Sequence, residues 1–287
     1  MSSAEAERSL EGKVVIVTGA GRGVGRAIAL ACAAEGARIV ANDLGCDAEG
    51  LGADPAIADA VAAEIRSARG EAVASAHDVA APGAASAIVE RAIESFGRVD
   101  ALISCAGIVA DRSVLKSDDA LVARVLDVHL RGNFALVRAA GQAMVDQKEG
   151  GAIILCTGPS AFFGARGQAV IGAASAGVVA LTRSAALELR KHRVRVNAIA
   201  PTARTRQTED LPTFQGIQEG SMSPAHVAPI AVFLASPLAE DVHGEVVGIA
   251  GARSYAFRSR ETTGAFSDGR PLSVREVRDA WRDITRA

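Results

Sequence analysis

The sequence is poor in aromatic residues: its 287 positions include one tyrosine, one tryptophan and eight phenylalanines, 3% in all. Ala, Val, Ile and Leu must therefore pack the core, and a hydrophobic content of 49% suffices for a large core. Cysteine is also scarce, and its spacing fits neither a disulfide scaffold nor a metal site. We expect reduced thiols at Cys32, Cys46, Cys105 and Cys156, and no metal ion.

Strong net charge and long apolar runs are absent as well. A formal net charge of −2 argues against a nucleic-acid binder, because polyanion binding needs a basic surface. No uninterrupted run of about 18 apolar residues occurs, which argues against a membrane span. Residues 1–8 are polar and acidic and lack the basic and apolar regions of a signal peptide. We therefore expect a soluble, cytoplasmic protein.

Short apolar, β-branched runs alternate with longer Ala-rich stretches. Apolar strands that alternate with helices are typical of a parallel sheet covered on both faces, and right-handed crossovers then give a doubly wound fold. The sequence predicts a single α/β domain over 1–287, a Rossmann-type doubly wound parallel sheet of about seven strands with helices on both faces. Its core spans about 13–251, and 252–287 form a C-terminal extension.

The elements follow from these runs and from the glycines that end several helices. A Gly- and Asp-rich insertion at 44–55 follows the second strand, and a last helix is expected to start at Ser273, where Ser273 and Glu276 match a capping box. Strands are predicted at 14–17, 38–42, 72–75, 101–104, 152–155, 194–199 and 245–249, and helices at 24–35, 56–69, 83–96, 118–146 and 171–190.

A glycine-rich loop from Thr18 to Gly25 follows the first strand and opens the first helix. Glycines let the backbone approach a pyrophosphate, and the helix N-terminus supplies amide donors; the alternative is a loop that needs its glycines only for packing. Asp43 closes the second strand, where a carboxylate accepts from the ribose hydroxyls and repels a 2′-phosphate. This favours NAD over NADP, although Arg22 would favour a 2′-phosphate. The loop residues assigned to the cofactor are Gly19, Arg22, Gly23, Val24 and Gly25.

Three further segments follow predicted strands: Asp78-Val79, Cys105-Ala106-Gly107, and Asn197 to Thr202. With the glycine-rich loop, they resemble motifs of the short-chain dehydrogenase/reductase family over about residues 13–251. The family has Asn where this sequence has Cys105, and Gly where it has Thr202. The resemblance implies a nicotinamide dinucleotide held by Asp78, Val79, Cys105, Ala106, Gly107, Pro201 and Thr202.

A closer similarity is to the (3R)-hydroxyacyl-CoA dehydrogenase region of multifunctional enzyme type 2 and its bacterial relatives. The similarity lies in Asn42 to Gly45 with the insertion that follows, in Val128 to Phe134, in Ala200 to Thr205 and in the extended C-terminus. It implies an acyl-CoA ligand.

The family uses a Ser-Tyr-Lys set in which tyrosine is the general acid/base, lysine lowers its pKa and serine positions the substrate oxygen. By resemblance these positions hold Gly158, Ile171 and Ser175, and the position of an accompanying Asn holds His129. Isoleucine exchanges no proton, and glycine offers no side chain. The resemblance therefore implies that none of the standard catalytic set is present.

Other groups could act in place of the missing set. His129 titrates near neutrality, although a histidine on a helix face is more often structural. Tyr255 lies far downstream, where packing is the simpler role, and no lysine occurs between Lys148 and Lys191. Hydroxyls and thiols expected at the carboxyl ends of the fourth and fifth strands are Cys105, Cys156, Thr157 and Ser160.

Three functions remain open. The first is a non-catalytic subunit of a heteromeric NAD-dependent dehydrogenase for a hydroxyacyl-CoA-like substrate, paired with an intact paralogue through helices 118–146 and 171–190. The second is an NAD-dependent oxidoreductase with non-standard catalytic residues. The third is a sensor of NAD or acyl-CoA without turnover. Loss of the lysine position predicts that NAD binding is weakened or lost in all three.

Overall fold

The computed structural model describes residues 8–286 except 110, 210–213, 215 and 219, so the expectation about a signal peptide lies almost wholly outside the described residues. The chain divides into two units, Met1–Ala256 and Phe257–Ala287. The first unit holds the sheet, and the second is the larger part of the predicted C-terminal extension.

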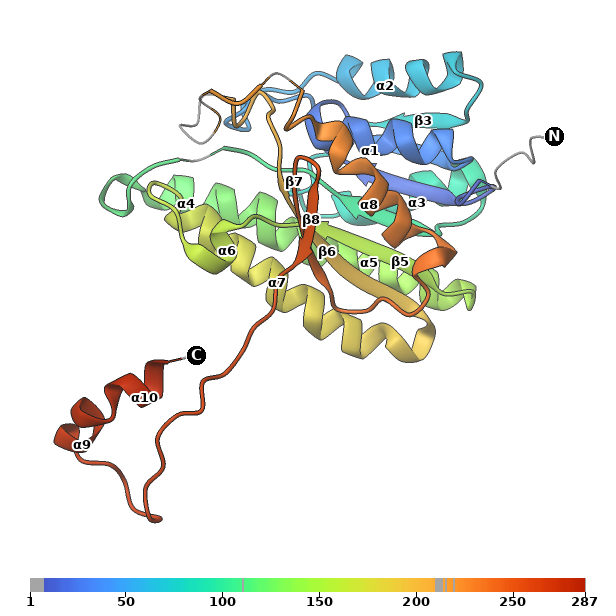
Figure 1. Cartoon of the computed structure of the whole chain (residues 1–287). Helices are drawn as coiled ribbons and strands as arrows, with labels where there is room; N and C mark the ends of the chain where they lie inside the picture. The colour runs from blue at the N-terminus through green and yellow to red at the C-terminus, as the bar shows by residue number, and fades with distance from the viewer. Residues whose placement is uncertain (1–7, 110, 210–213, 215, 219, 287) are drawn as a thin grey trace. The chain divides into compact units, whose positions relative to one another are not determined.

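The first unit is built on an eight-stranded sheet of order β3-β2-β1-β4-β5-β6-β7-β8 (Figure 1). Every neighbouring pair is parallel except β7 and β8, which are antiparallel. This confirms the predicted doubly wound α/β fold. The strands are β1 Val14–Thr18, β2 Arg38–Asn42, β3 Ala72–Ser75, β4 Ala101–Ser104, β5 Gly151–Cys156, β6 Val194–Thr202, β7 Val246–Ala250 and β8 Arg253–Ala256.

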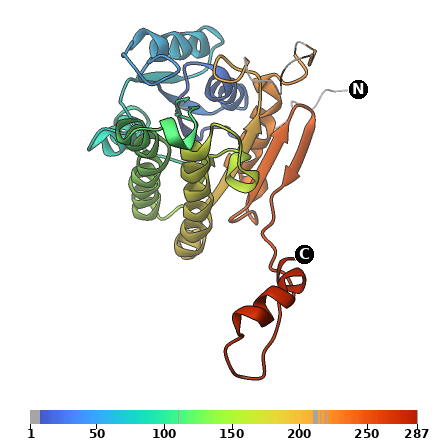
Figure 2. The same cartoon turned by 90° about the vertical axis from the view of Figure 1, so that its left-hand side faces the viewer.

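Helices cover both faces of this sheet (Figures 1 and 2). On one face α1, α2 and α8 share an apolar core with the strands, and on the other α3, α5 and α7 pack beside one another. A short helix, α6, leads into α7. The helices of this unit are α1 Gly23–Ala34, α2 Ala56–Ser67, α3 Ala84–Phe96, α4 Asp119–Leu126, α5 Gly132–Gln147, α6 Ser160–Phe163, α7 Ala169–Leu189 and α8 Ala228–Ala235.

Two features differ from the sequence-based expectation. The single helix predicted over 118–146 is helical throughout, from Asp119 to Gln147, but a π-helical turn at Asp127–Arg131 separates α4 from α5. Such turns occur often at functional sites, and this one carries His129. The strand β8 was not predicted, because its four residues are short and polar and form a strand only by pairing with β7.

One helix of the described part of the chain, Ala169–His192, is long and apolar enough to cross a membrane by length and composition alone. The sequence shows no uninterrupted apolar run here, because Ser175 and the polar run from Thr182 to Ser184 interrupt the helix. Ala174, Val178 and Val179 are buried, and the helix packs against β5 and β6. This is how a core helix of a sheet protein packs.

The second unit contains α9 Val274–Asp279 and α10 Trp281–Thr285. The predicted capping box is confirmed: the Ser273 hydroxyl accepts from the Glu276 amide, and the Glu276 carboxylate accepts from the Ser273 amide. The Arg270 guanidinium and the Ser273 groups lower the pKa of Glu276 to about 2. The Thr262 hydroxyl, which lies before α9 in the chain, donates to the Ile284 carbonyl oxygen of α10 at 2.6 Å.

Candidate functional site

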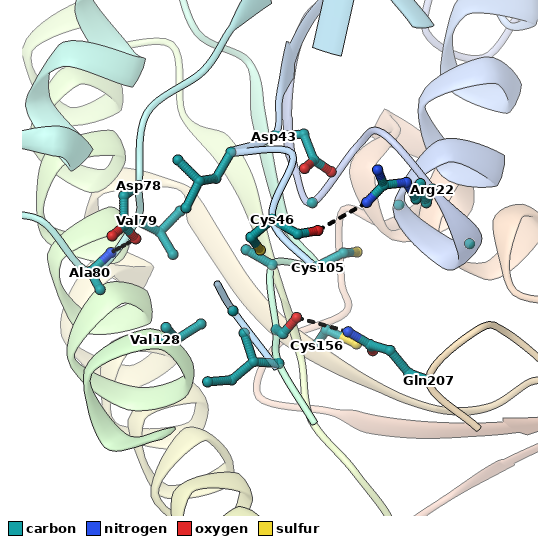
Figure 3. Close-up of a pocket in the computed structure, with 18 of the residues that line it drawn as sticks. Arg22, Asp43, Cys46, Asp78, Val79, Ala80, Cys105, Val128, Cys156 and Gln207 are labelled. Atoms are coloured by element: carbon teal, nitrogen blue, oxygen red, sulfur yellow. Dashed lines mark hydrogen bonds between the residues drawn. The ribbon is translucent and has the colours of Figure 1, made fainter. Parts of the chain in front are cut away.

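The turns that follow β1, β2, β3, β4 and β6 surround a cavity of about 710 Å³ (Figure 3). All of them leave the carboxyl ends of parallel strands, the edge at which doubly wound sheets bind ligands. The structure brings together every residue assigned to the cofactor except Thr202, which does not line the cavity. The lining residues among them are Gly19, Arg22, Gly23, Val24, Gly25, Asp43, Asp78, Val79, Cys105, Ala106, Gly107 and Pro201.

Backbone contacts explain two glycines of the loop after β1. A Cβ on Gly19, whose φ is +65°, would lie 2.7 Å from the Ala106 amide nitrogen. A Cβ on Gly25 would lie 2.0 Å from the Gly19 carbonyl oxygen. These positions exclude any side chain, so the loop lies tight against the turn after β4 and leaves the N-terminus of α1 facing the cavity.

Asp43 holds the loop from the end of β2. Its Oδ2 accepts from the Gly21 amide at 2.8 Å, and its Oδ1 accepts from the Gly45 amide at 2.7 Å. Each carboxylate oxygen can accept a second hydrogen bond, so the group can support the loop and still accept from a ribose. Asp43 therefore combines a structural role with the predicted binding role.

A buried amide positions the turn after β3. The Asn42 Oδ1 accepts from the Ser75 hydroxyl at 2.8 Å and from the His77 amide at 3.1 Å, and its Nδ2 donates to the His77 carbonyl at 3.1 Å. The turn then continues into Asp78, whose Oδ1 accepts from the Ala80 amide. Asn42 thus fixes where Asp78 and Val79 line the cavity.

The turn after β4 is held from two sides. The Thr18 hydroxyl lies 3.2 Å from that of Ser104 and accepts from the Ala106 amide at 3.4 Å. On the other side, His129 Nε2 lies 3.0 Å from the amide nitrogen and 2.9 Å from the carbonyl oxygen of Ile108. Burial lowers the pKa of His129, and its bond to Ile108 opposes this only in part. His129 is therefore a neutral positioning group rather than a proton donor.

Gly158, Ile171 and Ser175, which were assigned to the catalytic positions by resemblance, do not line the cavity. Thr157 donates to the Ser175 carbonyl at 2.9 Å, so the end of β5 is fixed against α7. A Cβ on Gly158 would lie 3.5 Å from the Ser175 hydroxyl. Ile171 packs with Ile108, Val125 and other apolar side chains of α4 and α7. An apolar cluster thus occupies the place where a proton donor was missing from the sequence.

The proposed substitutes are poorly suited to acid–base chemistry. The Thr157 hydroxyl is engaged with the Ser175 carbonyl, and His129 is engaged with Ile108. The Cys156 thiol and burial raise the pKa of Cys105 well above its usual value. Tyr255 lies in β8, opposite Gly248, at the edge of the sheet. No group of three His, Cys, Asp or Glu side chains in the described ranges could hold a metal ion.

Sequence reasoning missed the segment after β6. Gln207 donates to the Gly107 carbonyl at 3.0 Å, and Arg206 donates to the Cys46 carbonyl at 3.1 Å. Arg22 donates to the same carbonyl at 3.0 Å (Figure 3). The 44–55 insertion and the 203–208 segment therefore meet at the cavity. The sequence could have indicated this segment, because it follows a predicted strand and ligands bind at the carboxyl ends of parallel strands.

Comparison with known proteins places this geometry in a family. The family profile described as enoyl-(acyl carrier protein) reductase matches residues 19–251. A crystal structure of a short chain dehydrogenase from Mycobacterium avium superposes with a TM-score of 0.85 at 36% identity, covering 96% of this chain and 95% of that one. This chain belongs to the short-chain dehydrogenase/reductase family. Dehydrogenases of this family typically bind a nicotinamide cofactor.

Two curated relatives confirm the closer resemblance. The peroxisomal multifunctional enzyme type 2 of Drosophila melanogaster is 37% identical over 99% of this chain and 47% of its own length. A hydroxyacyl-CoA dehydrogenase of Mycobacterium tuberculosis is 38% identical over 96% of this chain and 89% of its own length. The chain thus spans about half of the multifunctional enzyme and nearly all of the bacterial dehydrogenase.

The burial of His129 predicts a loss of stability in mild acid. Burial also lowers the pKa of His243, so both histidines are neutral in the folded protein and gain protons more readily when it unfolds. Stability should therefore fall as pH drops through the unfolded histidine pKa of about 6.5. We expect urea unfolding to show a loss of about 1 kcal/mol or more between pH 7.5 and 5.5.

The variants His129→Asn and His243→Asn should each flatten this pH dependence, and the double variant should flatten it further. Asparagine is neutral at both pH values, so neither variant gains a proton at these positions in the folded or the unfolded state. A His129→Asn variant with the full wild-type pH dependence would contradict a buried, neutral His129.

Proposed function

We propose that this chain is a catalytically degenerate short-chain dehydrogenase/reductase that serves as the non-catalytic subunit of a heteromeric NAD-dependent dehydrogenase. The observation that supports this is the local structure at Gly158, Ile171 and Ser175. These positions lie together, with Ile171 in an apolar cluster, beside a cavity whose nucleotide-facing turns are complete. A scaffold that keeps the cofactor cavity and lacks the proton donor suits a subunit that binds and assembles without turnover.

We propose a hydroxyacyl-CoA-like substrate for the assembly. The support comes from relatives that include a hydroxyacyl-CoA dehydrogenase of nearly the same length. An acyl-CoA is also a possible ligand of this subunit itself. Four free thiols fit a cytoplasmic location, where thiols stay reduced.

We propose NAD as the cofactor, in preference to NADP. Asp43 lines the cavity at the end of β2, and a 2′-phosphate beside its carboxylate would be repelled. Arg22 would favour that phosphate, but its guanidinium already donates to Cys46. Without a lysine at Ser175, contacts to the nicotinamide ribose are fewer, so the affinity is expected to be low.

The paralogue is proposed to bind across α5 and α7. The outward side of α7 carries small exposed residues, Ala173, Ala176 and Ala180, which allow close approach of a second helix. Leu187 on α7 is 77% exposed and Phe134 on α5 is 57% exposed, which is unusual for large apolar side chains. Exposed small and apolar side chains of this kind suit packing in a four-helix bundle.

The tests that follow also distinguish two other functions. Turnover by the isolated wild-type protein would indicate an oxidoreductase with non-standard residues. The open cavity also suits a sensor of NAD or acyl-CoA, which would bind its ligand without turnover and without a partner.

NADH should bind about tenfold more tightly than NADPH, because Asp43 repels the added phosphate. Asp43→Ala should remove most of this difference. Titration calorimetry measures both affinities, with Asp59→Ala on the exposed side of α2 as a control of equal charge. Equal binding of both cofactors by the wild type, or an unchanged ratio in Asp43→Ala, would contradict the assignment.

The triple variant Gly158→Ser, Ile171→Tyr, Ser175→Lys should gain NADH-dependent reduction of a 3-ketoacyl-CoA, where the wild type has none. The added serine has room, since its Cβ makes only ordinary contacts. The matched control carries Ser, Phe and Met at the same positions, which fill similar volumes without titratable groups. Equal activity in both triple variants, each shown to be folded and to bind NADH, would rule out the missing proton relay as the cause of inactivity.

Affinity purification of the tagged chain from its native cells should recover a second short-chain dehydrogenase with a complete Ser-Tyr-Lys set in stoichiometric amount. Ala180→Arg should abolish this pairing, because a charged side chain then lies on the helix surface. Ala60→Arg, exposed on α2, is the control and should leave the pairing intact. Recovery of only the bait by all three proteins would exclude the heteromeric assembly.

A further inference from the structure

Two cysteines lie next to each other on the floor of the cavity. The parallel register of β4 and β5 pairs Ile103 with Ile154 and Ser104 with Leu155. Cys105 follows the last residue of β4, and continuing the same register by one step would bring it opposite Cys156 in β5. Side chains alternate between the faces of a sheet, so both cysteines share the face of Ile103 and Ile154. All four side chains belong to the same apolar cluster, which confirms this placement.

The spacing suits a disulfide. Laterally paired residues of neighbouring strands lie about 4.8 Å apart, and disulfides bridge Cα atoms that are about 4.4–6.8 Å apart. Cys156 also makes the largest contribution to the raised pKa of Cys105, as expected of a neighbouring thiol. Both are only partly buried and line the cavity, so a small reagent that enters the cavity reaches them (Figure 3).

The other two cysteines are placed differently. Cys32 lies in α1 and is fully buried, and burial raises its pKa to about 12. Cys46 belongs to the insertion after β2 and is not part of the paired strands β4 and β5. This leaves Cys105 and Cys156 as the matched pair.

We propose that Cys105 and Cys156 form a vicinal dithiol site that a peroxide closes to a disulfide on the floor of the nucleotide cavity. The Cys156 sulfur attacks one peroxide oxygen, the O–O bond breaks, and Cys156 becomes a sulfenic acid while water leaves. The Cys105 sulfur then attacks the Cys156 sulfur and displaces hydroxide, which takes the Cys105 proton and leaves as a second water. The two thiols are oxidised by two electrons, and the peroxide is reduced.

The raised pKa of Cys105 fits this order of events. A thiol that keeps its proton is a weak first nucleophile, so the first attack falls to Cys156. Cys105 then needs to lose its proton only as the S–S bond forms. Because protein thiols in reducing compartments form disulfides transiently, the site would respond to oxidant rather than stabilise the fold permanently.

Limited hydrogen peroxide treatment of the full-length protein, followed by trypsin digestion and mass spectrometry without reductant, tests the proposal. Cleavage after Arg98, Arg112, Lys148 and Arg166 places the two cysteines on separate peptides, 99–112 and 149–166, with one cysteine each. We expect these two peptides to appear linked, at about 2 Da below the sum of their masses, and to separate on reduction. A mixture of other linkages, or no linkage at peroxide levels that oxidise Cys46, would overturn the proposal.

Four single variants sharpen the assignment. Cys105→Ser and Cys156→Ser should lose the linked peptide, whereas Cys32→Ser and Cys46→Ser should keep it. As an independent measurement, phenylarsine oxide should bind the reduced wild type at one equivalent and should bind neither floor variant, because it bridges two adjacent thiols. Arsenical binding that survives Cys105→Ser would contradict the pairing even if a variant proved less stable.

One consequence depends on the proposed cofactor. Saturating NADH should slow formation of the linked peptide severalfold, because a nucleotide in the cavity covers the thiols. If the disulfide forms at the same rate with NADH bound, the dithiol site stands and the placement of NADH on this floor fails. If no disulfide forms although NADH binds, the cofactor proposal stands and the dithiol site fails.

Discussion

The cavity depends on the parallel pairing of β1, β4 and β5. Parallel strands run in one direction, so their carboxyl ends and the turns that follow meet at the same edge. At this edge Gly19 lies against Ala106, and the Thr18 hydroxyl contacts that of Ser104. A side chain on Gly19 or a slip of one residue in register would separate the loop after β1 from the turn after β4. The binding cavity is therefore a property of backbone geometry.

Because backbone geometry builds the cavity, its shape does not depend on the side chains at Gly158, Ile171 and Ser175, which do not line it. Ile171 and its apolar neighbours form a small cluster that adds to the core. His129 shows the same separation of roles, since its ring holds the Ile108 backbone and carries no charge at neutral pH. The lining of the cavity and the apolar cluster around Ile171 thus rest mostly on different residues.

The rim and the floor of the cavity are formed by segments that are far apart in the chain. Arg22 and Arg206 both donate to the Cys46 carbonyl, so the insertion after β2 and the segment after β6 meet where a nucleotide would enter. Cys105 lies in the turn after β4, and Cys156 ends the neighbouring strand β5. A change in the oxidation state of this pair would act directly on the turn that faces the cofactor.

The sequence by itself determined the doubly wound fold, the glycine-rich loop and most of the lining of the cavity, because strand and helix periodicity and glycine positions follow from local backbone geometry. It did not reveal β8, the π-helical turn at Asp127–Arg131 or the contacts of Arg206 and Gln207. Only the tertiary structure decided these features, and only it placed Cys105 beside Cys156. Each depends on contacts between segments far apart in the chain, which sheet register and packing set and which no local pattern encodes.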